Sequence, residues 1–336
     1  DLLSDLALDA GGSVVVVGLT TGALQGHENL RRQDGFVVKV APDGSVVWTD
    51  QFGTDQYDYA GGVSTDAADA IYVVGTTLGT LGSTRVGGYD AFIRKYAADG
   101  TVLWTTQYGT AASDSAVAVA VDAAGNVFVA GSTDGVFVEN TNSGASDAYV
   151  AMFDGAGSLQ WVRQFGASAD SSTSTGNMAL ADDGSIYVVG TTTGAFPGQT
   201  LTSQNDAFLA KLDADGEPVW FRQMGSGERS SMRAVAVDGE GNVLVTGDTM
   251  GELVPGQQAG GVDAFVVKYA PDGELVWARQ FGTELSDRPT SLVVDSLGAV
   301  KVVGETQGEL PGAARSGERD LFVADLTGAT GEVSGF

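Results

Sequence analysis

The chain has 336 residues, of which 43% are hydrophobic, so it holds enough apolar material for a large core. Its formal net charge is −26 and no apolar run reaches the length of a membrane span, so we expect neither nucleic-acid binding nor membrane insertion. The chain contains no cysteine, which excludes disulfides, thiolate metal sites and cysteine nucleophiles.

Three short motifs recur in a fixed order and divide the chain into six repeats. The first, G-x-T-x-G after an apolar run, starts at Gly18, Gly75, Gly131, Gly190, Gly247 and Gly304. The second, an Asp two residues before an aromatic, starts at Asp34, Asp90, Asp147, Asp206, Asp263 and Asp320, so the repeat is 56 to 59 residues long. The third, W-x-x-Q, starts at Trp48, Trp104, Trp161, Trp220 and Trp277. A sixth copy of W-x-x-Q would fall about where the chain stops, near Phe336.

Each repeat predicts four short β-strands, called A to D here. In the repeat from residue 114 to 166, strand A is expected over 116–122 and strand B over 127–131, on either side of a Gly-Asn turn. Strand C is expected to start at Asp147, and strand D to run over 159–164 after a glycine-bearing turn. Short apolar runs between turn residues indicate strands buried on both faces. No helical period or capping box occurs, so we predict an all-β chain.

Six such repeats predict a β-propeller. One four-stranded sheet cannot bury both of its faces, whereas six sheets packed radially can, with short protected edges. We therefore expect one domain over residues 1–336, a six-bladed β-propeller of four-stranded antiparallel blades, with the repeated tryptophans between neighbouring blades. The sixth repeat is atypical, because Asp325 replaces a lysine and residues 327–331 replace the usual Asp-Gly turn. Terminal repeats often differ in this way.

These motifs resemble the SBBP family of bacterial β-propeller repeats. The resemblance is clearest over residues 263–282 and 107–133, where the D-A-F, W, Q-F-G-T and G-N-V segments occur, and it covers nearly the whole chain. It implies a propeller in an exported or surface-attached bacterial protein, without implying a single activity. The family name implies seven blades, so either this propeller has six blades or another blade lies outside the chain.

The loops predict where a ligand binds. Propeller strands alternate in direction, so the A–B and C–D turns share one face and the B–C and D–A loops share the opposite face. The turns are short and nearly uniform, which is typical of a scaffold, whereas the B–C loops differ strongly in sequence. Those loops are residues 25–33, 81–89, 137–146, 196–205, 253–262 and 310–319. Varied loops on a rigid frame often carry binding sites, so we expect a protein or glycan ligand there or at the mouth of the central channel.

Repeated carboxylates are expected on the same face as the varied loops. Six open strand C, namely Asp34, Asp90, Asp147, Asp206, Asp263 and Asp320. Others share one position in the D–A loop, namely Asp1, Asp58, Asp114 and Asp287, with Thr173 and Ser230 in the remaining repeats. One interpretation is a Ca²⁺ site in each blade, because Ca²⁺ binds carboxylate and carbonyl oxygens. The interpretation we favour is that these aspartates accept hydrogen bonds from loop amides and orient the G-x-T-x-G threonines. No D-x-D-x-D-G loop occurs, and the sequence requires no cofactor.

Catalysis has little support from the residue types present. The one histidine, His27, lies in a varied loop, which favours a surface residue, and no G-x-S-x-G motif occurs. The glycine motif recurs once in each repeat, which indicates architecture rather than phosphate binding. Carboxylate pairs for glycoside cleavage stay open because acidic residues are plentiful. Scattered loop arginines could hold an acidic ligand, namely Arg31, Arg32, Arg85, Arg229 and Arg233.

Three functions therefore stay open. We expect an extracellular or cell-surface binding or adhesion module that uses the varied loops of one propeller face. The main alternative is a structural or assembly domain of a larger exported protein or filament, with further domains or chains beyond Phe336. The second alternative is a carbohydrate-active hydrolase or lyase. The lack of cysteine and the start at Asp1 rather than methionine favour a secreted or surface-attached bacterial product.

Overall fold

The computed structural model describes residues 1–168, 170–312 and 316–336. Over these ranges the chain forms 24 strands and no helix, as the motif pattern predicts. The described part of the chain accordingly contains no helix of the length and apolarity that crossing a membrane requires.

The strands form six sheets, which we call blades 1 to 6, and each blade is built from four strands in chain order. Blades 1 to 3 contain β1 (Leu2–Leu8), β2 (Val14–Thr20), β3 (Asp34–Val40), β4 (Val46–Phe52), β5 (Asp58–Thr65), β6 (Ile71–Thr77), β7 (Asp90–Tyr96), β8 (Val102–Tyr108), β9 (Asp114–Val121), β10 (Val127–Thr133), β11 (Asp147–Phe153) and β12 (Leu159–Phe165). Blades 4 to 6 contain β13 (Thr173–Leu180), β14 (Ile186–Thr192), β15 (Asp206–Leu212), β16 (Pro218–Met224), β17 (Ser230–Val237), β18 (Val243–Thr249), β19 (Asp263–Tyr269), β20 (Leu275–Phe281), β21 (Asp287–Val294), β22 (Val300–Thr306), β23 (Asp320–Leu326) and β24 (Val333–Gly335).

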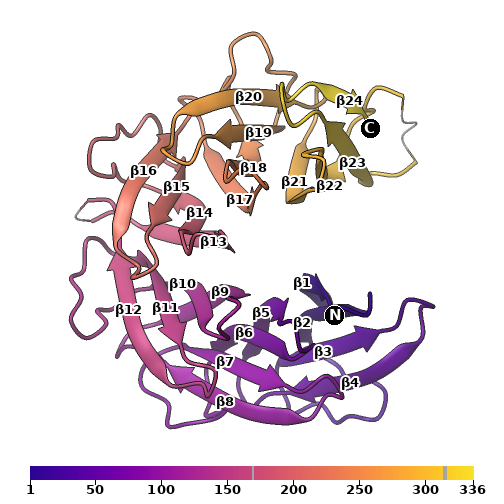
Figure 1. Ribbon diagram of the computed structural model, residues 1–336, viewed down its shortest axis with the longest axis vertical. Coiled ribbons are helices and arrows are strands. Elements are labelled where there is room, and N and C mark those ends of the chain that lie inside the picture. Colours follow the sequence, from indigo (N-terminus) through magenta and orange to yellow (C-terminus); the bar gives the residue numbers. More distant parts are fainter. Residues whose placement is uncertain (169, 313–315) are drawn as a thin grey trace. The chain divides into compact units, whose positions relative to one another are not determined.

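The blades fall into two compact units of three (Figure 1). Unit 1 is Asp1–Phe165 and contains blades 1 to 3, whereas unit 2 is Gly166–Phe336 and contains blades 4 to 6. The predicted fold class, a six-bladed β-propeller of four-stranded antiparallel blades, is confirmed. The assignment of residues 1–336 to a single domain stays a prediction.

The predicted strands of blade 3 match the structure closely. Strand A is β9, which starts two residues earlier than predicted and ends at Val121 rather than at Asp122. Asp122 is in the turn, where its Oδ1 accepts hydrogen bonds from the backbone of Ala124 and Asn126 at 2.9 and 2.8 Å. The side chain therefore closes the turn instead of extending the ladder. Strand B, β10, continues two residues beyond the predicted end at Gly131.

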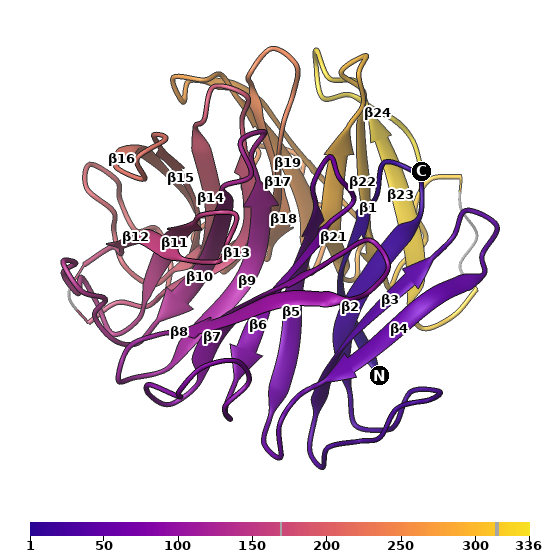
Figure 2. The same ribbon diagram turned by 60° about the horizontal axis from the view of Figure 1, so that its bottom comes forward.

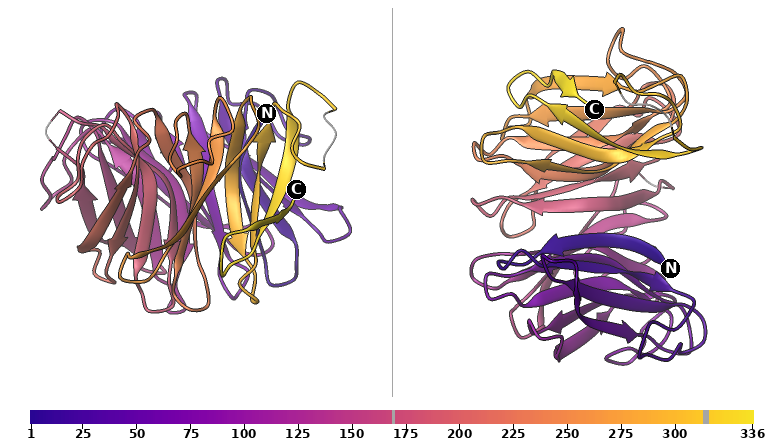
Figure 3. Two further views of the ribbon diagram at one scale, coloured as in Figure 1. Left: turned by 90° about the horizontal axis from the view of Figure 1, so that it is seen from above. Right: turned by 90° about the vertical axis from the view of Figure 1, so that its right-hand side faces the viewer.

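The core of each unit lies between the faces of successive blades, seen as stacked sheets in Figures 2 and 3. In unit 1, Val15 and Val37 of blade 1 belong to one buried cluster with Ile71 and Phe92 of blade 2. The strands are therefore apolar on both sides, because the middle of a blade has no solvent-facing surface. Unit 2 has the same construction between blades 4 and 5 and between blades 5 and 6.

Four of the five repeated tryptophans join one blade to the next, as predicted. The indole Nε1 of Trp48 donates a hydrogen bond to the carbonyl oxygen of Ala98, in the C–D turn of blade 2, at 3.1 Å. The ring covers the turn glycine Gly100, whose φ is +88° and where a Cβ would lie 2.8 Å from the indole. A side chain at this glycine would therefore collide with the ring. Trp104, Trp220 and Trp277 make the equivalent bond, at 3.3, 3.3 and 3.1 Å.

The loops gather at the two ends of the blades in the predicted way. At one end, the D–A loop meets the B–C loop of the preceding repeat, for example where Gly88 N donates to Ala112 O at 2.7 Å. At the other end, the A–B and C–D turns meet, and Gly12 lies against Pro42. Of the six varied loops, the sixth includes residues 313–315, which lie outside the described residues.

Candidate functional site

The aspartates that open strand C brace the varied loops. In blade 1, Asp34 Oδ2 accepts hydrogen bonds from the backbone N of Leu30 at 2.9 Å and from Gln51 Nε2 at 2.7 Å. Gln51 Nε2 also donates to Gly22 O at 2.9 Å, and its Oε1 accepts from Leu24 N at 2.7 Å. One glutamine and one aspartate therefore hold both ends of the B–C loop against strand D.

This bracing pair recurs in blades 2 to 5. The distances from glutamine Nε2 to aspartate Oδ2 are 2.8 Å for Gln107 and Asp90, 2.9 Å for Gln164 and Asp147, 3.1 Å for Gln223 and Asp206, and 2.8 Å for Gln280 and Asp263. In blade 6, Asp320 accepts instead from the backbone N and the Oγ of Ser316, at 2.8 and 2.6 Å. The motif pattern alone did not reveal the role of the glutamine, although its fixed place in W-x-x-Q was the available signal.

The aspartates at the start of strand A orient the threonine of G-x-T-x-G. Asp58 Oδ1 accepts from Thr77 Oγ1 at 2.5 Å, and Asp58 Oδ2 accepts from Thr54 N and Oγ1 at 2.6 and 2.9 Å. Burial raises the pKa of the Asp58 carboxyl, and the nearby charge of Asp34 adds to the rise. Asp287 accepts the same bonds from Thr306 and Thr283, and Asp1 accepts from Thr20.

These hydrogen bonds are the ones expected of loop-bracing aspartates. Among the described residues, no three His, Cys, Asp or Glu side chains lie together in a way that could hold a metal ion. The Oδ1 atoms of Asp34, Asp147 and Asp263 are nevertheless buried without a hydrogen-bond partner in the described part of the chain. Calcium binding at the repeated aspartates stays a prediction.

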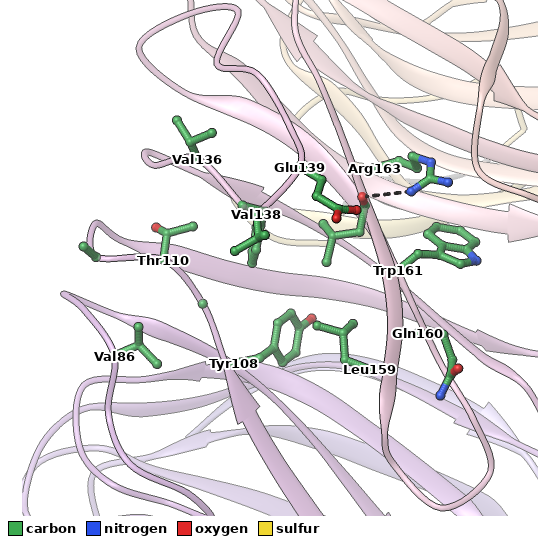
Figure 4. A pocket seen from close by; sticks show the side chains of 14 residues that line it. Val86, Tyr108, Thr110, Val136, Val138, Glu139, Leu159, Gln160, Trp161 and Arg163 are labelled. Carbon is green, nitrogen blue, oxygen red and sulfur yellow. Dashed lines mark hydrogen bonds between the residues drawn. The ribbon is translucent and has the colours of Figure 1, made fainter.

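A groove of about 520 Å³ lies on unit 1, where the loops of blade 2 meet blade 3. Its walls come from the end of β8 with the D–A loop behind it, the varied loop after β10, and β12. Figure 4 shows Val136, Val138 and Glu139 on the loop, with Leu159 and Trp161 on the neighbouring strand. The groove therefore combines a varied loop with the rigid outer strand of one blade.

The lining of the groove combines apolar side chains with several polar ones. Val138 is 89% exposed, which is unusual for a valine and leaves its side chain available to a partner. The Tyr108 hydroxyl is hydrogen-bonded to the Tyr149 hydroxyl at 3.1 Å, and burial raises the pKa of Tyr108. The Arg163 guanidinium lies 5.3 Å from the centre of the Trp161 ring. Tyr108 and Trp161 are therefore held in place by their neighbours on one side of the groove. The loop valines line its exposed side.

His27, Arg85 and Arg233 of the predicted loop residues each make a separate local contact. His27 Nε2 lies 3.0 Å from Thr49 Oγ1 and so braces the first varied loop against strand D. Arg85 donates to the carbonyl oxygen of Gly87 at 2.8 Å within its own loop. Arg233 forms an ion pair with the buried Asp248 in blade 5, a pair that other blades lack at this position. These side chains therefore do not form a common anion site in either unit.

The fold and its motifs define a propeller protein built from short repeats. Three segments, residues 103–137, 160–197 and 219–253, match the family of the SBBP beta-propeller repeat. The chain therefore carries SBBP repeats in these segments, and the resemblance predicted from the sequence is confirmed there. The groove lies largely within the first matched segment and the start of the second.

A curated relative is a regulatory protein. The regulatory protein FlaEY of Caulobacter vibrioides is 28% identical over 180 residues. The match covers 49% of this chain but 18% of FlaEY, so this chain corresponds to a small part of that protein. The match therefore shows a similar segment in the two proteins, and the activity of the whole relative is not carried over to this chain.

Solved structures share the fold at low identity. A protein of unknown function from Dyadobacter fermentans has a TM-score of 0.54 at 13% identity, over 96% of this chain and 93% of that chain. The Pan2 WD40 domain of Neurospora crassa has a TM-score of 0.53 at 9% identity, over 89% and 74%. A puromycin hydrolase has a TM-score of 0.53 at 12% identity, over 99% and 46%. At these identities the likeness shows the fold alone, and the fold is shared by an enzyme, so it does not decide the activity.

Proposed function

We propose that this chain is a binding module whose groove on unit 1 binds a segment of a protein partner through an apolar side chain. The observation that carries the proposal is the pair of exposed valines, Val136 and Val138, on a varied loop beside a rigid aromatic wall. Loops on a propeller can change without disturbing the blades, because the Asp–Gln pairs hold only the loop ends.

The chemistry of the groove favours a peptide over a glycan. Its lining includes the exposed aliphatic side chains of Val86, Val138 and Leu159, which suit the apolar anchor of a peptide. The chain carries a net charge of −26, and Glu139 sits at the groove. A partner with an apolar anchor next to lysine or arginine would match both the lining and the surrounding charge.

The experiment is selection of displayed random peptides on the purified chain. We expect enriched peptides to share an aliphatic or aromatic residue next to a basic residue, and to lose at least tenfold in affinity for a V138D variant. The control is V276D, which changes a half-exposed valine on β20 of unit 2, away from the groove. Peptides that bind wild type and V138D equally well would place the binding site elsewhere and refute the proposal.

An extracellular or cell-surface position belongs to the same proposal. The acidic composition supports it. The lack of cysteine supports it as well, because a free thiol is readily oxidised outside the cell. The measurement is digestion of intact native cells with a protease, followed by detection of the chain. Digestion of the chain while cytosolic proteins stay intact is the expected result, and full protection would contradict it.

A further inference from the structure

Three tyrosines and one arginine lie side by side where blade 1 meets blade 2, within unit 1. The Tyr57 and Tyr59 rings are nearly parallel, at 7°, and their centres are 6.3 Å apart. The centre of the Tyr89 ring lies 6.5 Å from that of Tyr59. The Arg32 guanidinium lies 4.9 Å from the centre of the Tyr57 ring. We call Arg32, Tyr57, Tyr59 and Tyr89 the tyrosine cluster.

The tyrosine cluster belongs to the end of the blades that carries the varied loops. Arg32 is in the first varied loop and Tyr89 is in the second, whereas Tyr57 and Tyr59 lie on either side of the residue that starts β5. The backbone that carries these two tyrosines is held in place. Tyr57 O accepts a hydrogen bond from Leu78 N at 2.9 Å, and β5 pairs with β6 from its first residue to its last.

The other blade junctions are built without these aromatic side chains. The residues on either side of the start of strand A are Ser113 and Ser115 in blade 3, Arg229 and Ser231 in blade 5, and Ser286 and Arg288 in blade 6. Strand A nevertheless starts in the same register, because Asp114, Ser230 and Asp287 each pair with the threonine of G-x-T-x-G, as Asp58 does. The scaffold therefore does not require tyrosines here. Side chains that one repeat adds among its loops are typical of a binding site.

The tyrosines offer flat apolar faces with polar edges. Burial raises the pKa of the Tyr59 hydroxyl, and the neighbouring Tyr89 adds to the rise, so the phenol keeps its proton at neutral pH. A neutral phenol ring packs against apolar groups, while its hydroxyl forms hydrogen bonds at the edge. A pyranose ring has the complementary pattern, with C–H bonds on its faces and hydroxyls around its edge. The tyrosines therefore suit the ring of a sugar.

Arg32 adds a charged donor at one end of the tyrosine cluster. Its side chain is exposed, and in the described part of the chain it takes part in no hydrogen bond or ion pair. A guanidinium that stacks on an aromatic ring uses its face, which leaves the N–H groups at its edge free to donate. These N–H groups match the paired oxygens of a carboxylate. The cluster therefore combines a place for a sugar ring with a place for an acidic group.

The loops around the tyrosine cluster are less acidic than the chain as a whole. In the first two varied loops and the D–A loop that precedes β5, exposed arginines outnumber exposed acids, with Arg31, Arg32 and Arg85 against Glu28 and Asp55. The whole chain, by contrast, carries a formal net charge of −26. An anionic ligand is therefore repelled less here than the net charge of the chain would predict.

We propose that the tyrosine cluster binds a uronate residue of an acidic polysaccharide, with the sugar ring packed on the tyrosines and its carboxylate paired with Arg32. The cluster is distinct from the groove on unit 1, because none of its four residues lines that groove. Binding at the cluster is therefore independent of the peptide site proposed for the groove.

The experiment is fluorescence polarisation of the full chain with labelled tetramers of galacturonate, mannuronate and guluronate. The methyl ester of each tetramer is the neutral match, and a chelator is present so that calcium cannot bridge carboxylates. Y57S and Y59S introduce the residue that blade 3 has at the equivalent position, so folding is expected to survive. The control is V138D, in the groove. Circular dichroism and a cooperative urea transition check that each variant is folded.

We expect wild type and V138D to bind at least one uronate tetramer in preference to its ester, and Y57S and Y59S to bind it about tenfold more weakly. R32Q is expected to bind the acid no more tightly than the ester, because the paired cation is gone. A wild type that binds none of the three uronates, or that binds acid and ester equally, overturns the proposal. Unchanged binding in both tyrosine variants, or an equal loss in V138D, would place the sugar elsewhere and overturns it as well.

Discussion

Lys39 Nζ lies 2.9 Å from Asp9 Oδ2 and 3.2 Å from the carbonyl oxygen of Ala98, so one ammonium joins the A–B turn of blade 1 to the C–D turn of blade 2. Both charged side chains are nearly buried. The Lys39 ammonium lowers the pKa of the Asp9 carboxyl, outweighing the effect of its burial. Blade 5 repeats the arrangement, with Lys268 Nζ 2.8 Å from Asp238 Oδ2 and 3.2 Å from Gly328 O.

Loss of this lysine is expected to destabilise the protein strongly. K39M leaves the Asp9 carboxylate buried without its cation, which costs about 3 to 5 kcal/mol in the free energy of unfolding. K301M removes the exposed ion pair with Asp325 of blade 6 and should cost about 0 to 1 kcal/mol. Urea unfolding of both variants measures the difference. Equal losses in the free energy of unfolding for K39M and K301M would show that the buried Lys39–Asp9 pair contributes no more than an exposed pair.

The glutamine of W-x-x-Q is expected to contribute more to stability than any exposed glutamine. Gln280 Oε1 accepts from Leu253 N at 2.8 Å, and its Nε2 donates to Gly251 O at 3.1 Å and to Asp263 Oδ2 at 2.8 Å. Q280L leaves these buried partners unsatisfied, at about 2 to 4 kcal/mol. Q160L, on the exposed start of β12, should change stability by about 0.5 kcal/mol at most. Thermal and urea unfolding compare the two, and similar losses would refute the bracing role.

The first glycine of G-x-T-x-G is required by close backbone packing. A Cβ at Gly75 would lie 1.8 Å from the carbonyl oxygen of Tyr59 and 2.8 Å from the Phe92 ring. G75A therefore forces strands β5 and β6 apart and should cost about 3 kcal/mol or more. G239A is the control, because a Cβ there meets nothing within 4 Å. A folded G75A variant with wild-type urea midpoint would contradict this account.

The stability contributed by Asp58 is expected to fall as the pH rises. Burial raises the pKa of its carboxyl above the ordinary value of 3.8, so the folded state binds this proton more readily than the unfolded state does. The contribution is then complete below pH 3.8 and is lost as the pH rises through the raised pKa. The cost of D58N should therefore be larger near pH 4 than at neutral pH.

Asp9 provides the comparison of opposite sign for the pH experiment. Its pKa is lowered, first by the hydrogen bond from Lys39, so its contribution is present above pH 3.8 and is lost as the pH falls through the lowered pKa. The cost of D9N should therefore shrink on acidification. Urea unfolding at several pH values measures the stability of both variants. If the costs of D58N and D9N change in the same direction with pH, the opposite pKa shifts of Asp58 and Asp9 are not their cause.

Calcium is expected to leave the stability unchanged if the repeated aspartates act as loop braces. Thermal unfolding with calcium and with excess chelator, at fixed ionic strength, is the measurement. A ligand that binds only the folded state adds roughly 2.7 kcal/mol at a hundredfold excess over its dissociation constant. A rise of that order, absent in D34N and D263N, would assign the buried Oδ1 atoms to a metal.

Much of the fold could be predicted from the sequence because its signals are local. The six copies of G-x-T-x-G and of the strand C aspartate mark where each strand lies, since a strand and its turns are encoded by neighbouring residues. The four-stranded blades, the two sets of loops and the inter-blade tryptophans followed from that pattern.

The tertiary structure alone decided which distant side chains meet. Gln51 and Asp34 are 17 residues apart, and the groove joins Val86 to Arg163, so no local pattern pairs them. Trp48 and Ala98, the acceptor of its indole hydrogen bond, are likewise 50 residues apart. The reason is physical: a repeat specifies the strands and turns of one sheet, whereas contacts between loops and between sheets depend on how distant parts of the chain fold together.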